Sequence, residues 1–306
     1  MPSSVTVRVP AKVNLALHVG PPRADGFHGV ATVFHAVSIY DDLVATPLAA
    51  GKGTKVHVDG EGAGVVPLDA SNLAVRAAQA LVAHGASPDV SLTIRKGIPV
   101  AGGMAGGSAD AAAALVAVDA LFELGLTREA LLEIAATLGS DVPFSLQGGT
   151  AIGHDRGNDL TSVLVRGTYH WVFALADGGL STPAVYAECD RLRGVDVPEP
   201  TVPDAMLVAL ASGDAEALGA SLSNDLQRAA VSLRPQLAQV LAVGEEYGAL
   251  GGVVSGSGPT CAFLARDEEH ALDLAVAFTA SGVCRTVKRA HGPVPGARVV
   301  DSRAGH

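Results

Sequence analysis

A glycine-rich loop is the stretch of this sequence best suited to bind a phosphate. Residues 98–115 read IPVAGGMAGGSADAAAAL, so four glycines run into a serine and then a row of alanines. Glycine is the poorest ordinary helix former and alanine the best, so the loop should pass directly into a helix over about residues 109–124. The free N–H groups and the dipole of a helix start attract anions such as phosphate. A tight structural turn would explain the same glycines, so the loop alone leaves both interpretations open.

Two familiar phosphate-binding loops do not fit this stretch. A Walker A loop requires Gly-Lys-Ser/Thr, whereas Gly107 is followed by Ser108 and Ala109. The dinucleotide fingerprint belongs to the first strand–helix turn and needs an acidic residue at the end of the next strand. Here the loop lies about a hundred residues into the chain, and the candidate acids Asp119 and Glu123 fall inside the helix. An NAD(P)-dependent dehydrogenase is therefore disfavoured.

Other polar residues could take part in group transfer. Residues 12–19, KVNLALHV, alternate between polar and apolar, so Lys12 and Asn14 should project from one face of a strand. Asp141, in LGSDVPF, follows a helix stop and could accept a proton or bind a metal ion. His28, next to Phe27, could recognise a ring or a phosphate. A solvated lysine, a capping aspartate and a surface histidine are the simpler explanations, and they stay open at this point.

Several other chemistries lack an anchor in the sequence. There is no H-E-x-x-H, no G-x-S-x-G and no close His/Cys cluster, which disfavours metalloproteases and serine hydrolases. Cys189, Cys261 and Cys284 are widely spaced and form no C-x-x-C pair, so no zinc site is expected. Three unpaired thiols suit a reducing compartment.

Composition bounds the class of protein further. A chain of 306 residues exceeds what one hydrophobic core usually supports, so two domains are expected. A net charge of -10 without any basic run argues against nucleic acid or an anionic membrane as partner. The N-terminus lacks the apolar core of a signal peptide, and the uncharged span 247–265 is broken by glycines and a proline. We therefore expect a cytoplasmic protein.

The elements that must position these residues follow from periodicity and turn signals. Strands and helices come in mixed order with several consecutive strands, which favours an α+β fold over a doubly wound one. A second domain should begin near the strand at 168–176. Pro10 should interrupt the first strand. Strands are expected at 4–9, 12–19, 33–48, 54–60, 89–100, 168–176 and 261–265, hairpins within 147–163, and helices at 71–85, 109–124, 127–139, 205–222 and 233–248.

Three motifs in order resemble those of the galactokinase–homoserine kinase–mevalonate kinase–phosphomevalonate kinase (GHMP) superfamily. They are PAKVNLALHV at 10–19, PVAGGMAGGSADAAAAL at 99–115 and SGSGPT at 255–260. The resemblance implies an α+β, two-domain GHMP kinase fold. Its N-terminal, ribosomal-protein-S5-like ATP-binding domain would span 1–165, and its C-terminal, ferredoxin-like domain on the substrate side would span 166–306. It also implies ATP-dependent phosphorylation of an alcohol, with Mg²⁺ bound mainly through the ATP phosphates and no set of protein metal ligands.

A finer resemblance rests on RADGFH at 23–28, LGSDVPF at 138–144 and LSTPAVY at 180–186. These segments are similar to the family of kinases that phosphorylate the 2-hydroxyl of a cytidine diphosphate-linked methylerythritol in non-mevalonate isoprenoid synthesis. The resemblance implies that small molecule as partner, with no nucleic acid and no membrane, and we expect a monomer or weak homodimer.

The resemblance also implies a role for individual residues. Lys12 and Asp141 would be catalytic, with Asp141 accepting the proton of the attacking hydroxyl. Phe27 and Tyr186 would enclose the cytosine, and His28 would hydrogen-bond its edge. The substrate-binding residues would be Asn14, Phe27, His28, Thr182 and Tyr186, and the ATP-binding residues Asn72, Lys96, Pro99, Gly102, Gly103, Met104, Ala105, Gly106, Gly107 and Ser108.

Two departures from the family pattern stand out. Ala109 occupies the place of a common second loop serine, and Phe27 replaces the usual tyrosine. The alternatives are a different kinase of the superfamily, of homoserine or mevalonate type, and a nucleotide-binding regulator without turnover. The aromatic pair Phe27 and Tyr186 argues against the first, and the presence of both Lys12 and Asp141 argues against the second.

Overall fold

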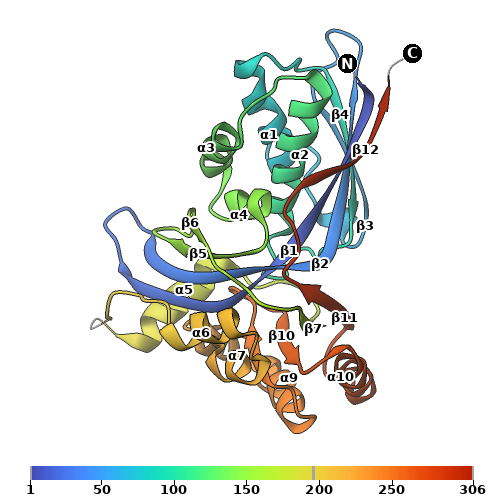
Figure 1. Cartoon of the computed structure of the whole chain (residues 1–306). Coiled ribbons are helices and arrows are strands. Elements are labelled where there is room, and N and C mark those ends of the chain that lie inside the picture. The colour runs from blue at the N-terminus through green and yellow to red at the C-terminus, as the bar shows by residue number, and fades with distance from the viewer. Residues whose placement is uncertain (1, 195–196, 305–306) are drawn as a thin grey trace.

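Two β-sheets, each with helices packed against it, build the molecule. In Figure 1 most of the first sheet lies in the upper half, part of it reaches down beside the lower helices, and the second sheet lies in the lower half. The computed structural model describes residues 2–194 and 197–304. The first sheet contains β1 (Pro2–Pro22), β2 (His28–Pro47), β3 (Lys55–Gly60), β4 (Val90–Lys96), β5 (Thr150–His154), β6 (Asp159–Ser162), β8 (Ser223–Asn224) and β12 (Arg298–Ala304). The second contains β7 (Tyr169–Leu175), β9 (Gly251–Val254), β10 (Cys261–Ala265) and β11 (Thr286–Gly292).

The long antiparallel pair β1–β2 runs from one half of the molecule to the other (Figure 1). The prediction that Pro10 interrupts the first strand is wrong, because β1 is continuous from Pro2 to Pro22. The pairing of β1 with β2 shifts register between Pro10 and Ala11, and such a bulge removes the need for the N–H that proline lacks. A second shift follows Asn14. The pairing of the strand that carries Lys12 with β2 is therefore irregular on both sides of this residue.

Helix α2 (Gly106–Phe122) is the centre of the upper core. It packs on β1, β2 and α1, and ten of its residues are buried, six of them alanine. The helix starts before the predicted residue 109, because Ala105 takes up a left-handed conformation that turns the chain sharply into it. It ends before Glu123, which is also left-handed. Around α2 lie α1 (Leu73–Ala80), α3 (Arg128–Leu138) and α4 (Val142–Gln147).

The predicted starts of α1 and α3 are confirmed to within two residues, whereas the short helix α4 was not predicted. Asn72 caps α1 by accepting a hydrogen bond from Ala74 N at 2.9 Å, and Thr127 caps α3 by accepting one from Ala130 N at 3.2 Å. Gly139 ends α3, as expected.

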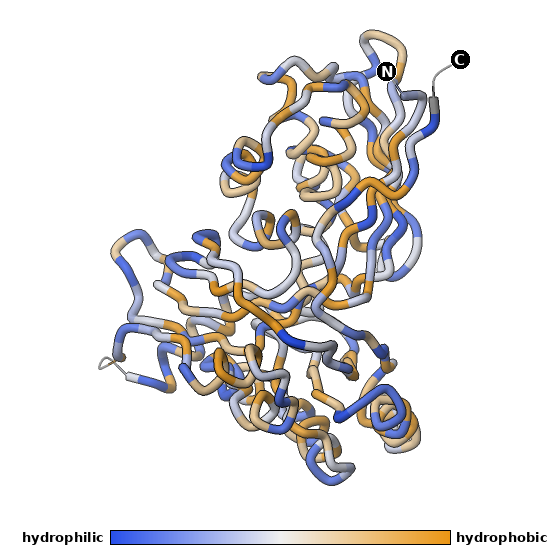
Figure 2. The backbone as a smooth tube through the Cα atoms, viewed as in Figure 1, coloured by the Kyte–Doolittle hydropathy of each residue, from blue (hydrophilic) through white to orange (hydrophobic). Residues whose placement is uncertain are grey.

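Helices surround the second sheet in the lower half. Its strand order is β11-β7-β10-β9, and every pair is antiparallel. Hydrophobic stretches follow the strands and inner helices, whereas hydrophilic ones gather at loops and helix ends (Figure 2). The lower helices are α5 (Thr182–Arg193), α6 (Asp204–Ser212), α7 (Ala215–Ser221), α8 (Gln227–Leu233), α9 (Gln236–Glu246) and α10 (Glu268–Ser281).

The expected α+β class is confirmed, with two sheets and mixed element order. The division into 1–165 and 166–306 remains a prediction. It places the second sheet, which begins at β7, in the second domain, but β12 returns to pair with β1 in the first sheet. Among the described residues, no helix is long and apolar enough to cross a membrane.

A buried ion cluster joins the sheet to the start of α2. Lys96 Nζ lies 2.5 Å from Asp41 Oδ2 and 2.7 Å from Asp110 Oδ2, and all three side chains are at most 4% exposed. Burial raises the pKa of Asp110 well above its usual range. Burial opposes the charge on Lys96, but the two carboxylates outweigh it and raise the pKa of the lysine. Lys96 Nζ also donates to Gly106 O at 3.3 Å, which fixes the first residue of α2.

Replacing Lys96 by Met should destabilise the fold strongly. Asp41 and Asp110 would remain buried without their counter-charge, which typically costs about 3–5 kcal/mol. Urea denaturation should show a loss of that order in the free energy of unfolding. Arg95→Met is the matched control, because the Arg95 side chain is 78% exposed on the same strand. A similar small loss in both variants would contradict the importance of the cluster.

Candidate active site

A cavity of about 670 Å³ lies where the two halves meet. Its walls come from β1, β2, the loop before α2, the start of α4, helix α5 and the loop between β9 and β10. Ten of the predicted site residues line it: Lys12, Asn14, Phe27, His28, Gly103, Ala105, Ser108, Asp141, Thr182 and Tyr186. The sequence motifs thus converge on one place.

Lys12 and Asp141 face each other in this cavity. Lys12 Nζ lies 3.7 Å from Asp141 Oδ2, with the lysine side chain 7% exposed and the aspartate 31% exposed. The distance exceeds that of a hydrogen bond, so the carboxylate can still accept a proton from a third group. Asp141 precedes α4, but its side chain makes no capping hydrogen bond. The capping role left open by the sequence is therefore not what the structure shows.

Asn14 fixes the position of the Lys12 ammonium. Lys12 Nζ donates to Asn14 Oδ1 at 2.6 Å, and Asn14 Nδ2 donates to Thr32 Oγ1 at 2.8 Å. Thr32 in turn donates to Ala16 O at 2.7 Å. The chain of hydrogen bonds leaves each polar atom partnered and holds the ammonium toward the cavity.

The glycine-rich loop adopts conformations that L side chains rarely take. Ala101, Gly103 and Ala105 have φ angles of 54°, 75° and 62°. Ser255 Oγ donates to Gly103 O at 3.1 Å, and Met104 O accepts from Lys12 N at 3.3 Å. The loop is thereby tied both to the SGSGPT segment and to the strand that carries the lysine.

The start of α2 borders the cavity, since Ala105 and Ser108 line it. The first N–H groups of a helix have no partner within it and carry partial positive charge. The site thus offers main-chain donors and a lysine ammonium on one side and the Asp141 carboxylate on the other. This arrangement can bind an anionic group next to an acceptor for a proton.

The remaining predicted ATP-binding residues lie outside the lining of this cavity: Asn72, Lys96, Pro99, Gly102, Met104, Gly106 and Gly107. The Asn72 side chain caps α1, and the Lys96 ammonium is enclosed by Asp41 and Asp110. Contacts of Lys96 with a nucleotide would therefore have to come from its main chain.

The far end of the cavity is aromatic. Phe27 is 51% exposed, and the Arg156 guanidinium carbon lies 3.9 Å from its ring centroid. Tyr186 packs beside His28 with ring centroids 5.1 Å apart. Burial, followed by the nearby Asp141 charge, raises the pKa of Tyr186 to about 12. Its phenol therefore stays neutral near pH 7, as a stacking ring requires.

Sequence reasoning missed five polar residues that also line the cavity: Thr32, Ser140, Arg156, Asp190 and Ser257. Asp190 follows Tyr186 by four residues, so helical spacing could have placed both on one face of α5. Arg156 lies in the turn between β5 and β6, where no periodicity indicates its direction.

The donor set fits a magnesium ion held mainly by phosphates. Among the described residues, no group of three or more His, Cys, Asp or Glu could hold a metal ion. Asp141 and Ser108 nevertheless offer oxygen atoms in the same cavity. Mg²⁺ commonly takes one or two carboxylates together with substrate phosphates, so a fully protein-built cage is not required.

Comparison with known proteins shows the family to which the chain belongs. The family model "GHMP kinases N terminal domain" matches residues 72–149, and "GHMP kinases C terminal" matches residues 206–284. The 4-diphosphocytidyl-2-C-methyl-D-erythritol kinase of Thermobifida fusca is 60% identical over 98% of this chain and 99% of its own. The proteins of the same name from Streptomyces coelicolor and Mycobacterium tuberculosis are 59% and 55% identical, over 97% and 98% of this chain and 100% and 94% of theirs.

Solved structures of kinases have the same fold as this chain. A crystal structure of 4-(cytidine 5'-diphospho)-2C-methyl-D-erythritol kinase superposes with a TM-score of 0.76 at 33% identity, covering 93% of this chain and 98% of the other. Homoserine kinase from Cytophaga hutchinsonii gives 0.75 at 20% identity, covering 98% of each chain, which shows the fold alone. The fold and the site thus define an ATP-dependent kinase of GHMP type, as the motifs predicted. The chain belongs to the 4-diphosphocytidyl-2-C-methyl-D-erythritol kinase family.

Replacing Gly103 by Ala should push the glycine-rich loop away from the SGSGPT loop at 255–260. A Cβ atom at this position would lie 2.1 Å from Ser255 O, and the φ angle of +75° is itself strained for alanine. Overpacking of this kind typically costs about 1–3 kcal/mol, and kinase turnover should fall with it. Gly64→Ala is the control, since a Cβ there meets nothing within 4 Å. Unfolding by urea and an ADP-release assay measure both effects, and wild-type values for Gly103→Ala would contradict the loop contact.

Proposed function

We propose that this chain uses ATP to phosphorylate the 2-hydroxyl of 4-diphosphocytidyl-2-C-methyl-D-erythritol, giving the 2-phosphate and ADP. The single observation that carries the proposal is the cavity that joins the Lys12–Asp141 pair to an aromatic end containing Phe27, His28 and Tyr186. The names of its relatives at 55–60% identity support the same substrate. The reaction belongs to non-mevalonate isoprenoid precursor synthesis.

Asp141 would accept the proton of the attacking hydroxyl. An alcohol is a poor nucleophile at pH 7, and a positioned base contributes about 10²–10⁴-fold to the rate. Lys12, 3.7 Å away and held by Asn14, would stabilise the charge that develops on the hydroxyl oxygen. Phosphoryl transfer depends mainly on such positioning and charge neutralisation.

The loop at 102–108 and the start of α2 would bind the ATP phosphates through main-chain N–H groups, and Ser108 would add its hydroxyl. Asn72 and main-chain atoms of Lys96 and Pro99 would lie toward the adenine. Mg²⁺, when bound, neutralises phosphate charge, and Asp141 and Ser108 are the residues that would contact it. Ala109 supplies no second hydroxyl, so the site would manage with Ser108 and the backbone.

Phe27 and Tyr186 would enclose the cytosine ring, with Thr182 nearby and His28 at the edge of the base. Arg156 covers one face of Phe27, so the base would use the other face. A flat pyrimidine between aromatic rings, with polar groups at its edge, is how such pockets combine affinity with specificity.

The division of labour would follow the two parts of the chain. We place ATP on the side of residues 1–165 and the cytidylyl substrate toward residues 166–306. We further propose a cytoplasmic monomer or weak homodimer that takes neither nucleic acid nor membrane as partner, in keeping with its net charge of -10.

An ADP-release assay with a panel of acceptors tests the function directly. We expect turnover with 4-diphosphocytidyl-2-C-methyl-D-erythritol and none above background with homoserine or mevalonate, because only the first has a pyrimidine for the aromatic end. The reverse pattern would replace this proposal with another kinase of the same superfamily, and no turnover with any acceptor would favour a non-catalytic nucleotide-binding protein.

Asp141→Asn should separate binding from chemistry. The amide keeps the size of the carboxylate but cannot accept the proton, so kcat should fall about 10²–10⁴-fold while the ATP dissociation constant stays close to wild type. Calorimetric titration and steady-state kinetics measure the two quantities. Asp159→Asn, an exposed change on β6, is the matched control. Near-normal kcat in Asp141→Asn would remove this residue from the chemistry.

A further inference from the structure

Helix α5 presents one continuous polar and aromatic face to the substrate end of the cavity. Thr182, Tyr186 and Asp190 follow one another at intervals of four residues, which places them on the same side of a helix, and all three line the cavity. Only Thr182 and Tyr186 have a role in the proposed function. Asp190 is the member of this face whose contribution is still open.

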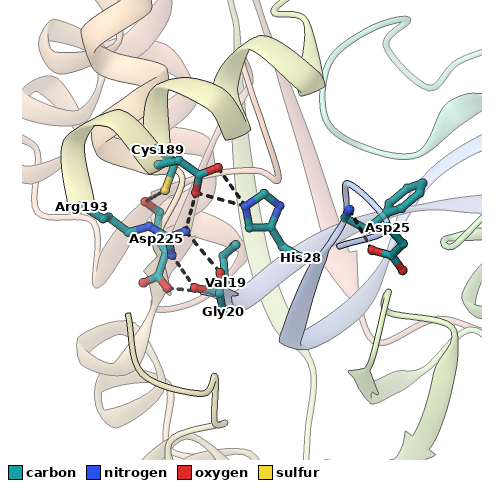
Figure 3. Close-up of polar contacts among 9 residues, drawn as sticks. Val19, Gly20, Asp25, His28, Cys189, Arg193 and Asp225 are labelled. Carbon is teal, nitrogen blue, oxygen red and sulfur yellow. Dashed lines mark hydrogen bonds and ion pairs between the residues drawn. The ribbon is translucent and has the colours of Figure 1, made fainter. Parts of the chain in front are cut away.

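Asp190 makes a two-pronged contact with His28. His28 Nε2 lies 3.0 Å from Oδ1 and 3.0 Å from Oδ2 of the carboxylate, and the histidine side chain is only 7% exposed (Figure 3). Tyr186 packs against the same imidazole. The ring is therefore held by a tilted ring contact with one helix residue and by hydrogen bonding to another one turn further on.

Arg193 holds the carboxylate in place. Its Nη2 lies 3.0 Å from Asp190 Oδ1, and its guanidinium also donates to the carbonyl oxygens of Val19 and Gly20 on β1 (Figure 3). An arginine stays charged at any physiological pH and offers donors in a rigid fork. The chain of contacts from β1 through Arg193 and Asp190 thus fixes both the position and the orientation of the His28 ring.

We propose that Asp190, positioned by Arg193, sets the tautomer of His28 and thereby makes the site select cytosine over uracil. The inference rests on the proposed function, since it concerns the base that the aromatic end binds. Asp190 acts through His28 and is in this sense a positioning residue that determines specificity.

The tautomer of His28 follows from which atoms of the carboxylate and the imidazole can donate or accept hydrogen bonds. A carboxylate only accepts hydrogen bonds, so Nε2 of His28 must carry the proton that lies between them. In the neutral imidazole the other nitrogen, Nδ1, then has a lone pair that can accept a hydrogen bond. Second partners of this kind fix which nitrogen of a histidine is protonated.

Cytosine and uracil differ at the atom that such a lone pair would meet. Cytosine carries an exocyclic amino group, which donates hydrogen bonds, whereas uracil carries a carbonyl oxygen, which accepts them. An accepting Nδ1 attracts the first and repels the second. A buried polar pair matched to one base commonly contributes about 1–3 kcal/mol of discrimination, equivalent to roughly 5- to 150-fold in affinity.

Two measurements on the wild-type enzyme test the proposal. Long-range ¹H–¹⁵N correlation spectra at pH 8 should show His28 protonated at Nε2 and bare at Nδ1 in the absence of substrate. Calorimetric titration should show tighter binding of the cytidylyl substrate than of its uridylyl counterpart, by at least about 10-fold, as expected for one matched hydrogen bond. A proton on Nδ1, or equal affinity for the two nucleotides, would overturn the inference.

Asp190→Asn should reduce this preference, because the amide can present its NH₂ group to Nε2 and no longer specifies one tautomer. We expect the cytidylyl-to-uridylyl affinity ratio to fall about 10-fold and the ¹⁵N signals of His28 to move toward a tautomer mixture. KM for the cytidylyl substrate should rise, while kcat at saturation stays within about twofold, since the hydroxyl and Asp141 are untouched.

Glu188→Gln is the matched control. Glu188 lies on the same helix but contacts Arg191 and Ser232 away from the cavity, so the affinity ratio should not change. An unchanged ratio and unchanged ¹⁵N signals in Asp190→Asn would refute the role of Asp190. Selective binding of the cytidylyl ligand without turnover would refute the proposed function alone, because binding and tautomer are measured without ATP.

Discussion

The placement of one nearly buried ammonium, that of Lys12, determines how the rest of the site is built. A lysine head group taken out of water needs partners that replace its hydration. Asn14, on the same strand, provides one, with its Oδ1 2.6 Å from Lys12 Nζ. Asp141, just before α4, provides an opposite charge 3.7 Å from the same Nζ. The main chain of Lys12 also donates to Met104 O. Strand β1, the glycine-rich loop and α4 therefore all meet at this residue, and the cavity is what remains between them.

A second buried lysine, Lys96, shows by contrast what makes Lys12 suited to chemistry. Lys96 is paired closely with Asp41 and Asp110, and its carboxylate partners are themselves buried. Its side chain is almost fully buried and also donates to Gly106 O, so its effect is to fix the start of α2. Within the part of the chain that the structure describes, Lys12 pairs with one carboxylate, that of Asp141, which is farther away at 3.7 Å and 31% exposed. One lysine holds the start of α2 in place, and the other leaves its charge facing the cavity.

Local patterns in the sequence predicted the elements better than they predicted the contacts between them. Alternation placed Lys12 and Asn14 on one strand face, and their 2.6 Å hydrogen bond agrees. The helices predicted from residues 71 and 127 begin just after Asn72 and Thr127, so both starts are correct to within two residues. Pro10 misled, because a bulge in the pairing with β2 absorbs it, and this depends on the partner strand. The start of α2 was misplaced because a left-handed Ala105 has no compositional signature.

In the site, too, local motifs pointed to individual residues but not to the contacts between distant segments. The resemblance to GHMP kinases implied roles for the glycine-rich loop, Lys12 and Asp141, because each lies in a short local motif. The His28–Asp190 contact joins residues 162 positions apart, and no period within either segment could reveal it. In the proposed function, β1, the loop and α4 of the upper half would supply the chemistry, whereas recognition would depend on where α5 of the lower half lies against the 23–28 turn. The acceptor could therefore change without any change in the Lys12–Asp141 geometry, because the residues that would read it belong to a different helix.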